Sequence, residues 1–242
     1  MSIPQPTRIV VDADPCTGHS RTRVLQPGRF LAPRPLRPTG AAARIALVGT
    51  RASLCAGDEL ELHVEADVGS AVELVDPGGT VAYHMRGGRA RWEAHITLAR
   101  GSRLAWREQP FVVSTGATVH RGMHAELDAD ARLLCWETLV LGRGGEDGGT
   151  LDTRTRVHQA GAELLAEDLD LRAPDARQLP GILGPHRVLG QVTLVGTRPP
   201  EAASPQRLDL ADPGALQRQL CASTHVCDAQ LAPVWQRWRE LL

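Results

Sequence analysis

Leu133-Leu-Cys-Trp-Glu-Thr-Leu-Val-Leu-Gly-Arg143 is a long apolar run with one carboxylate, Glu137, in its middle and a Gly-Arg pair at its end. Such a run predicts a strand that is buried on both faces, because a strand with one wet face alternates apolar and polar residues. A buried acid beside a tryptophan needs a hydrogen-bond donor, a cation or a proton. Glu137 is therefore the first candidate functional residue, and an outward position on an edge strand is the alternative.

Short turns rich in small residues recur on both sides of this run. They are spaced by about thirty residues, which is the spacing of stacked structural repeats. An alternating strand such as Glu59–Glu65 comes before the turn, and a more apolar strand such as Leu104–Trp106 follows it. This pattern predicts an all-β body of helically wound, stacked sheets. The four turns are Asp67–Ala71, Ala99–Arg103, Asp128–Arg132 and Gln159–Glu163.

Alignment of the repeats on their turns places acidic residues at equivalent positions. Equivalent positions in stacked repeats lie above one another, so we expect a column of acids. A solvated, charged face is the alternative interpretation of the same pattern. The acids are Asp76, Glu108 and Glu137, each seven residues after Gly69, Gly101 and Asp130, and either Glu167 or Asp168, six or seven residues after Gly161.

The N-terminal part of the chain lacks the repeat pattern. Residues 1–22 are predicted to be a poorly ordered lead-in with one strand at Thr7–Val11. Leu31–Gly40 contains three prolines and is predicted to be an extended surface crossing before the strand Ala43–Val48.

After Leu171 the pattern changes to loops and helices within what we expect to be a single domain over residues 1–242. Two short C-terminal helices are predicted in residues 207–242. Asp212-Pro213 is a favourable helix start leading into Gly214–Ala222, and a second helix is expected from Pro233 to Leu242.

Composition excludes several classes of function. The formal net charge is −1, and all 27 basic residues are arginine. Neither nucleic acid nor a membrane surface is therefore an expected partner, and lysine chemistry is excluded. The five cysteines form no CxxC pair, and the first residues lack an apolar signal core, so we expect a reducing, cytoplasmic setting.

Two groups of potential metal ligands stand out. His120, His124 and Glu126 share one side of a predicted strand, as in a cupin-like site, although an extended strand separates the two histidines by about 13 Å. Cys221, His225 and Cys227 are weak candidates for a soft metal, and buried filler with a surface histidine is the alternative. No serine lies in a pattern typical of a catalytic triad, so the residues favour a protein that is not an enzyme.

Several short motifs occur in a fixed order along the chain. They are Pro35–Gly40, Gly57-Asp58-Glu59-Leu60, Gly69–Ala71, Pro77–Thr80 with Tyr83, Leu104–Pro110 with Trp106, Gln109 and Pro110, Trp136–Arg143 with Gly142, and Leu164–Leu169. Their order and spacing resemble the UreD (UreH) family of urease accessory proteins. The resemblance runs from about Pro33 to Leu171 and more loosely to the C-terminus. The chain departs from the family pattern at Ala56-Gly57-Asp58, at Thr80-Val81, which lacks the usual lysine, and at Glu108, where an acid is unusual.

The resemblance implies a cytoplasmic scaffold that links apo-urease to the accessory proteins UreF and UreG during nickel insertion. It also implies a mostly-β, helically wound fold and an internal passage for nickel. By motif, the lining residues of that passage are Asp58, Thr80, Glu137 and Glu167. Nickel would then be cargo in transit rather than a tightly bound cofactor. A cupin-like or β-helical metal-dependent enzyme and a purely structural interaction module are the competing classes.

Overall fold

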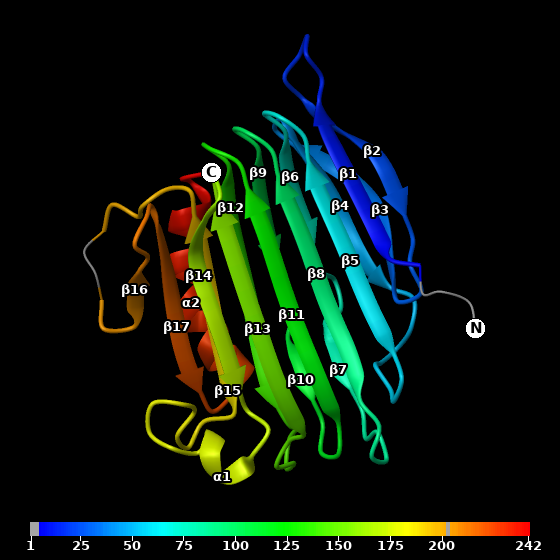
Figure 1. Cartoon of the computed structure of the whole chain (residues 1–242), viewed down its shortest axis with the longest axis vertical. Coiled ribbons are helices and arrows are strands. Elements are labelled where there is room, and N and C mark those ends of the chain that lie inside the picture. The colour runs from blue at the N-terminus through cyan, green and yellow to red at the C-terminus, as the bar shows by residue number, and fades with distance from the viewer. Residues whose placement is uncertain (1–4, 202–203) are drawn as a thin grey trace.

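The computed structural model describes residues 5–201 and 204–242, which form two β-sheets packed face to face (Figure 1). The first sheet has seven strands, in the spatial order β14 (Ala162–Asp170), β13 (Thr150–Gln159), β11 (Thr118–Leu127), β8 (Ala90–Leu98), β5 (Glu59–Ala66), β1 (Thr7–Ala13) and β2 (Ser20–Gln26). The second sheet has ten. Eight follow the order β16 (Arg207–Asp209), β17 (Gly214–Cys221), β15 (Val188–Val195), β12 (Arg132–Leu141), β9 (Arg103–Arg107), β6 (Ala71–Val75), β4 (Ala42–Gly49) and β3 (Leu31–Thr39). The other two are β10 (Phe111–Val113), which pairs with β12, and β7 (Thr80–Ala82), which pairs with β10.

The central strands of both sheets are parallel, because the chain winds from one sheet to the other and back. It crosses from β5 to β6, from β8 to β9 and from β11 to β12 at the first three predicted turns. Gly69, Gly101 and Asp130 occupy equivalent places in these turns, with φ angles of 68°, 66° and 60°. Glycine and aspartate tolerate this left-handed conformation better than most residues. The predicted all-β fold of helically wound, stacked sheets is confirmed.

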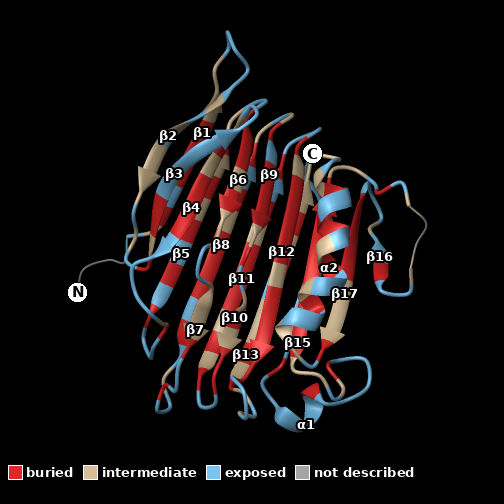
Figure 2. Ribbon diagram, turned by 180° about the vertical axis from the view of Figure 1, so that it is seen from behind, coloured by how far each residue is buried: buried red, intermediate tan, exposed pale blue. Residues whose placement is uncertain are grey.

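Two apolar layers hold the molecule together. The main core lies between the sheets and takes alternate residues from both. A smaller core lies between the second sheet and the helix α2 (Thr224–Arg239), which packs on β12, β15 and β17 through Leu231, Trp235 and Trp238 (Figure 2). This cover explains why β15 is buried at every position. The first sheet instead keeps a polar outer face, which agrees with its alternating sequence.

The N-terminal prediction is confirmed in part, because the predicted strand Thr7–Val11 lies within β1, but the expected lead-in is wrong for the described residues. In place of a lead-in, β1 pairs in parallel with β5, and β2 pairs antiparallel to β1. Residues 1–4 lie outside the described part. The proline-rich segment is extended, as predicted, but it forms β3 and pairs with β4. Because β3 is the last strand of its sheet, its prolines fit the ladder, where only one side needs donors.

One of the two predicted C-terminal helices is also wrong. Gly214–Cys221 is strand β17, which pairs antiparallel with β15. Without β17, β15 would have an open edge, and the local helix signal at Asp212-Pro213 contains no information about that edge. A terminal helix is present, as predicted, but α2 begins before the predicted start at Pro233, at Thr224, and ends at Arg239 instead of Leu242. A further short helix, α1 (Pro174–Arg177), lies in the expected loop region. In the described part of the chain, no helix has the length and apolar character needed to cross a membrane.

Candidate functional site

The predicted acidic column lies inside the sandwich. Parallel pairing places Val75 opposite Arg107 and Arg107 opposite Trp136, so the next residues, Asp76, Glu108 and Glu137, lie side by side on neighbouring strands. They follow the alternation of the core residues of these strands and point between the sheets. The prediction is confirmed for these three acids.

Glu108 is the most deeply buried acid of the row, and a buried arginine from the opposite sheet neutralises it. Arg121 on β11 donates from Nη2 to both carboxylate oxygens of Glu108, at 2.9 and 2.7 Å. Its guanidinium stacks over Trp92, 4.0 Å from the ring centroid, and also faces Phe111. Burial raises the pKa of Glu108 to about 7, and Glu137 and Asp76 add to this, whereas Arg121 opposes it.

Glu137 lies beside this pair and is half-buried. One of its oxygens is 3.5 Å from Arg121 Nη2, and the other accepts a hydrogen bond of 3.3 Å from the Gln191 amide on β15. Arg218 on β17 in turn donates to Gln191 Oε1 from Nε at 2.9 Å. The row of acids therefore continues as a row of polar contacts across the second sheet.

The fourth acid does not stack with the other three. Glu167 belongs to β14 in the first sheet, because the turn at Ala160–Gly161 closes an antiparallel hairpin instead of crossing between the sheets. It nevertheless joins the row from the opposite side, since Arg218 Nη2 donates to both of its oxygens at 2.7 Å. Asp168 is exposed and pairs with Arg154 and Arg156. Glu167 is thus the inward residue of the two.

Of the other two predicted lining residues, Thr80 lies near Asp76 at one end of the row, and Asp58 is separate from the row. Asp76 and Thr80 line a surface cavity of about 340 Å³. Asp58 is buried in the turn before β5, where it accepts a hydrogen bond from the backbone N–H of Cys55 at 2.9 Å and lies 3.6 Å from Arg29. Among the described residues, no hydrogen bond or ion pair joins Asp58 or Thr80 to Glu137 or Glu167.

The remaining motif residues have structural surroundings. Gly57 and Gly142 have φ angles of 79° and 84°, and a Cβ on Gly142 would lie 2.5 Å from the Glu146 carbonyl oxygen. This conformation and close approach require glycine. Trp106 and Trp136 are core side chains, Arg143 pairs with Glu146 and faces Tyr83, the Gln109 N–H donates to Asp76, and the Pro110 carbonyl accepts from Thr80 N–H.

The structure brings together two of the three weak metal candidates at the C-terminus, because the side chains of Cys221 and Cys227 are in contact. Cys221 at the end of β17 and Cys227 on α2 are both buried, whereas His225 is exposed. Burial raises the pKa of Cys227 to about 12, which disfavours the thiolate that binds metals. Within residues 5–201 and 204–242, one group of three potential ligands does converge, namely Glu61, His63 and His95.

Sequence reasoning missed the basic partners of the row. Arg121 has the same alternation as Val119 and Met123, which are core residues of β11, so its inward position was a readable signal. Arg218 lacked that signal because its strand was predicted to be a helix. In both arginines one nitrogen, Nη2, donates to both oxygens of a carboxylate across the space between the sheets.

Comparison with known proteins identifies the family. Residues 14–242 match the family model described as UreD urease accessory protein. The chain is 52% identical over 234 residues to Urease accessory protein UreD 1 of Streptomyces griseus, covering 97% of this chain and 91% of that one. It is 30% identical over 219 residues to Urease accessory protein UreD of Streptomyces avermitilis, covering 89% and 86%.

These similarities extend over both sheets and α2, and they define a urease accessory protein. The chain belongs to the UreD family.

Proposed function

We propose that this chain is a cytoplasmic, non-catalytic scaffold for nickel insertion into apo-urease and that it works in a complex with UreF and UreG. Family membership supports the role in urease maturation. The proposal that the chain conducts nickel rests on the interior row of Asp76, Glu108 and Glu137. This row continues through Gln191 and Arg218 to Glu167. In this proposal nickel is cargo that moves along the row.

The chemistry of the row suits transit better than storage. Oxygen donors lower the free energy needed to remove water from a dication, and a complete ligand set would trap it. Carboxylates spaced on successive strands supply few donors at each point. The surface cavity beside Asp76 and Thr80 gives one end of this route.

Arg121 is the charge that a passing dication must displace. Its Nη2 lies between Glu108 and Glu137, at 2.7 and 3.5 Å from their nearest oxygens. Arginine stays protonated in proteins, so a metal ion between these two acids would meet a fixed positive charge. The proposal therefore includes release of Arg121 from Glu108 when the complex conducts nickel.

The test replaces one acid at a time in cells that mature urease. Glu137→Gln removes the negative charge and keeps a similar shape and an oxygen for Gln191. It should leave the complex with UreF and urease intact and lower the nickel content of the purified urease, because a neutral wall raises the barrier to a dication. Glu163→Gln is the matched control, since Glu163 is an exposed acid on the same strand as Glu167.

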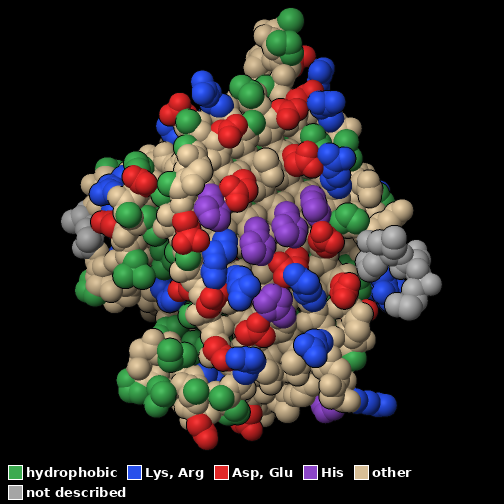
Figure 3. Space-filling view, in the orientation of Figure 1, with side chains coloured by type: hydrophobic (Ala, Val, Ile, Leu, Met, Phe, Trp, Pro, Cys, Tyr) green, Lys and Arg blue, Asp and Glu red, His purple; other side chains and the backbone are tan. Residues whose placement is uncertain are grey.

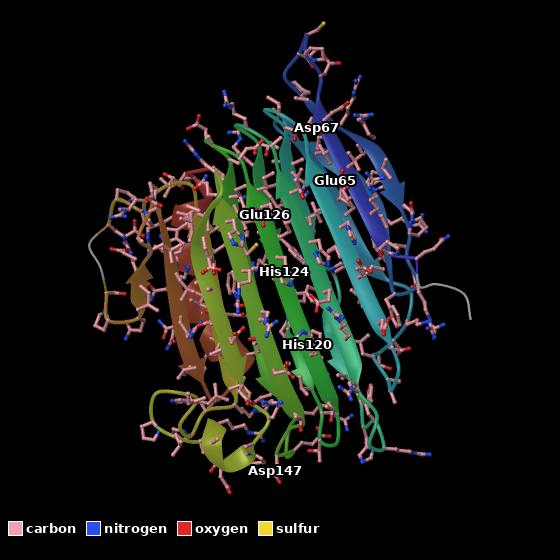
Figure 4. The ribbon with its side chains drawn as sticks, in the orientation of Figure 1. Glu65, Asp67, His120, His124, Glu126 and Asp147 are labelled. Carbon is pink, nitrogen blue, oxygen red and sulfur yellow. The ribbon has the colours of Figure 1, made fainter. Side chains whose placement is uncertain are left out.

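A second candidate is that the row serves the fold alone, as in a structural interaction module. The pairs Glu108–Arg121 and Glu167–Arg218 favour it, because an arginine nitrogen donates to both oxygens of each acid without a metal. Normal nickel content with Glu137→Gln, in a complex of normal composition, would assign the row to the fold. The cupin-like alternative has less support, because His120 and His124 lie along β11 on the outer face of an open sheet (Figure 4).

A further inference from the structure

The outer face of the first sheet carries a row of histidines. His63, His95 and His124 come from β5, β8 and β11, and the parallel register places each directly opposite the next. Figure 3 shows histidines gathered at the centre of this face, among acids and arginines. They lie on the opposite side of the sheet from the interior row, since strand alternation sends them away from the core.

Two of these histidines and one acid form a compact donor set. His63 Nε2 is 2.6 Å from Glu61 Oε1, and His95 Nε2 is 3.9 Å from the same oxygen. The ligand atoms of the three residues all lie within 4.8 Å of one another. Their side chains are 34% to 44% exposed, so a hydrated ion can reach them. Two imidazoles and a carboxylate are a common ligand set for first-row transition metals and leave coordination positions for water.

His124 and Glu93 extend this set. The His124 ring stacks on His95, with centroids 5.4 Å apart and an interplanar angle of 11°. Glu93 lies beside them with a side chain only 6% exposed. One of its oxygens accepts from Arg91 at 2.8 Å, while the other is buried without a hydrogen-bond partner, 3.6 Å from His124 Nε2.

Gly122 makes room for this buried carboxylate, because a Cβ at that position would overlap it. An unsatisfied buried oxygen is unfavourable in a folded protein unless a proton or cation completes it.

We propose that Glu61, His63 and His95 form an exchangeable site for a divalent first-row transition metal on the outer face of the first sheet, with His124 as a neighbouring ligand. A carboxylate that contacts an imidazole ligand strengthens a metal site, and Glu93 lies next to the imidazole of His124. The site is independent of the interior row, because it lies on the other face of the sheet. It stands whether or not the row conducts nickel.

The experiment titrates the full chain, purified without a histidine tag, with Ni²⁺ in a calorimeter and repeats the titration with Zn²⁺. We expect saturation near one metal per chain. The double substitution His63→Gln/His95→Gln should weaken binding at least about 100-fold, since loss of a group behind a ligand already weakens metal sites about 10- to 100-fold. His158→Gln is the matched control, because His158 lies on the same face but pairs only with the acids Glu126 and Glu163.

Both substituted histidines are partly exposed, so the variants should fold, and far-ultraviolet circular dichroism checks that they do. Co²⁺ offers a second readout, because its visible absorption changes when imidazole replaces water as a ligand. Metal uptake by the double variant equal to that of the native chain would overturn the proposal. Binding that does not saturate, or an equal loss in His158→Gln, would also overturn it.

Discussion

Replacing Arg121 by methionine is a direct test of the interior charged row. Arg121 and Glu108 have side chains only 3% and 7% exposed, and two hydrogen bonds join them. At pH 8 the substitution leaves Glu108 without its buried counter-charge. Breaking a buried pair in this way lowers the free energy of unfolding by about 3–5 kcal/mol. The loss of the stack on Trp92 acts in the same direction.

The substitution should lower the free energy of unfolding by less in mild acid, and the pKa of Glu108 determines the direction of this pH dependence. Its pKa is raised from an ordinary 4.5 to about 7 in the folded protein, so the folded state binds the proton more tightly than the unfolded chain does. The stability that this proton provides is complete below about pH 4.5 and is lost as the pH rises through about 7. Arg121 lowers the pKa of Glu108, so without Arg121 the pH range in which this proton stabilises the fold extends to higher pH. The variant should therefore recover more stability than the native chain between pH 8 and pH 5.

The assay is urea unfolding followed by tryptophan fluorescence at pH 8 and pH 5. The double variant Arg121→Met/Glu108→Met should regain most of the loss, because an apolar pair needs no buried counter-charge. Arg154→Met is the control, since Arg154 forms an exposed pair with Asp168, and exposed pairs contribute at most about 1 kcal/mol. A change below about 1 kcal/mol for Arg121→Met at pH 8, or a double variant no more stable than the single one, would refute the reasoning.

Two further predictions concern the second sheet and α2. In the native chain, Cys16 and Cys55 should react rapidly with a thiol reagent because they are exposed, whereas the three buried cysteines should react only in denaturant. A spectrophotometric titration counts the thiols that react in each state. A count of five fast thiols in the native state would contradict the buried position of Cys227 on the inner side of α2. Gly190→Ala should destabilise the protein by about 1–3 kcal/mol, because its Cβ would overlap the Cys227 sulfur. Adding Cys227→Ala should restore part of that loss in thermal unfolding, and no difference between the single and double variants would show that α2 packs differently.

Local patterns determined the body of the fold. The alternation of strands and the turns around Gly69, Gly101 and Asp130 predicted the winding, because a period of two and a left-handed turn residue are properties of short segments. The same repeat spacing was sufficient to align the acids Asp76, Glu108 and Glu137 in one row. Motif order and spacing were sufficient to indicate the family.

Tertiary structure decided what these local signals could not. Gly214–Cys221 follows a favourable helix start, yet it becomes a strand, because the free edge of β15 offers it a complete ladder. The grouping of His63 and His95, like the pairing of Glu108 with Arg121, depends on strand register and on which faces meet. The alternation of residues along a strand predicts which face of that strand each side chain occupies. Which residues from other strands lie opposite it, and therefore whether its charge is paired, follows only from how the sheets are assembled.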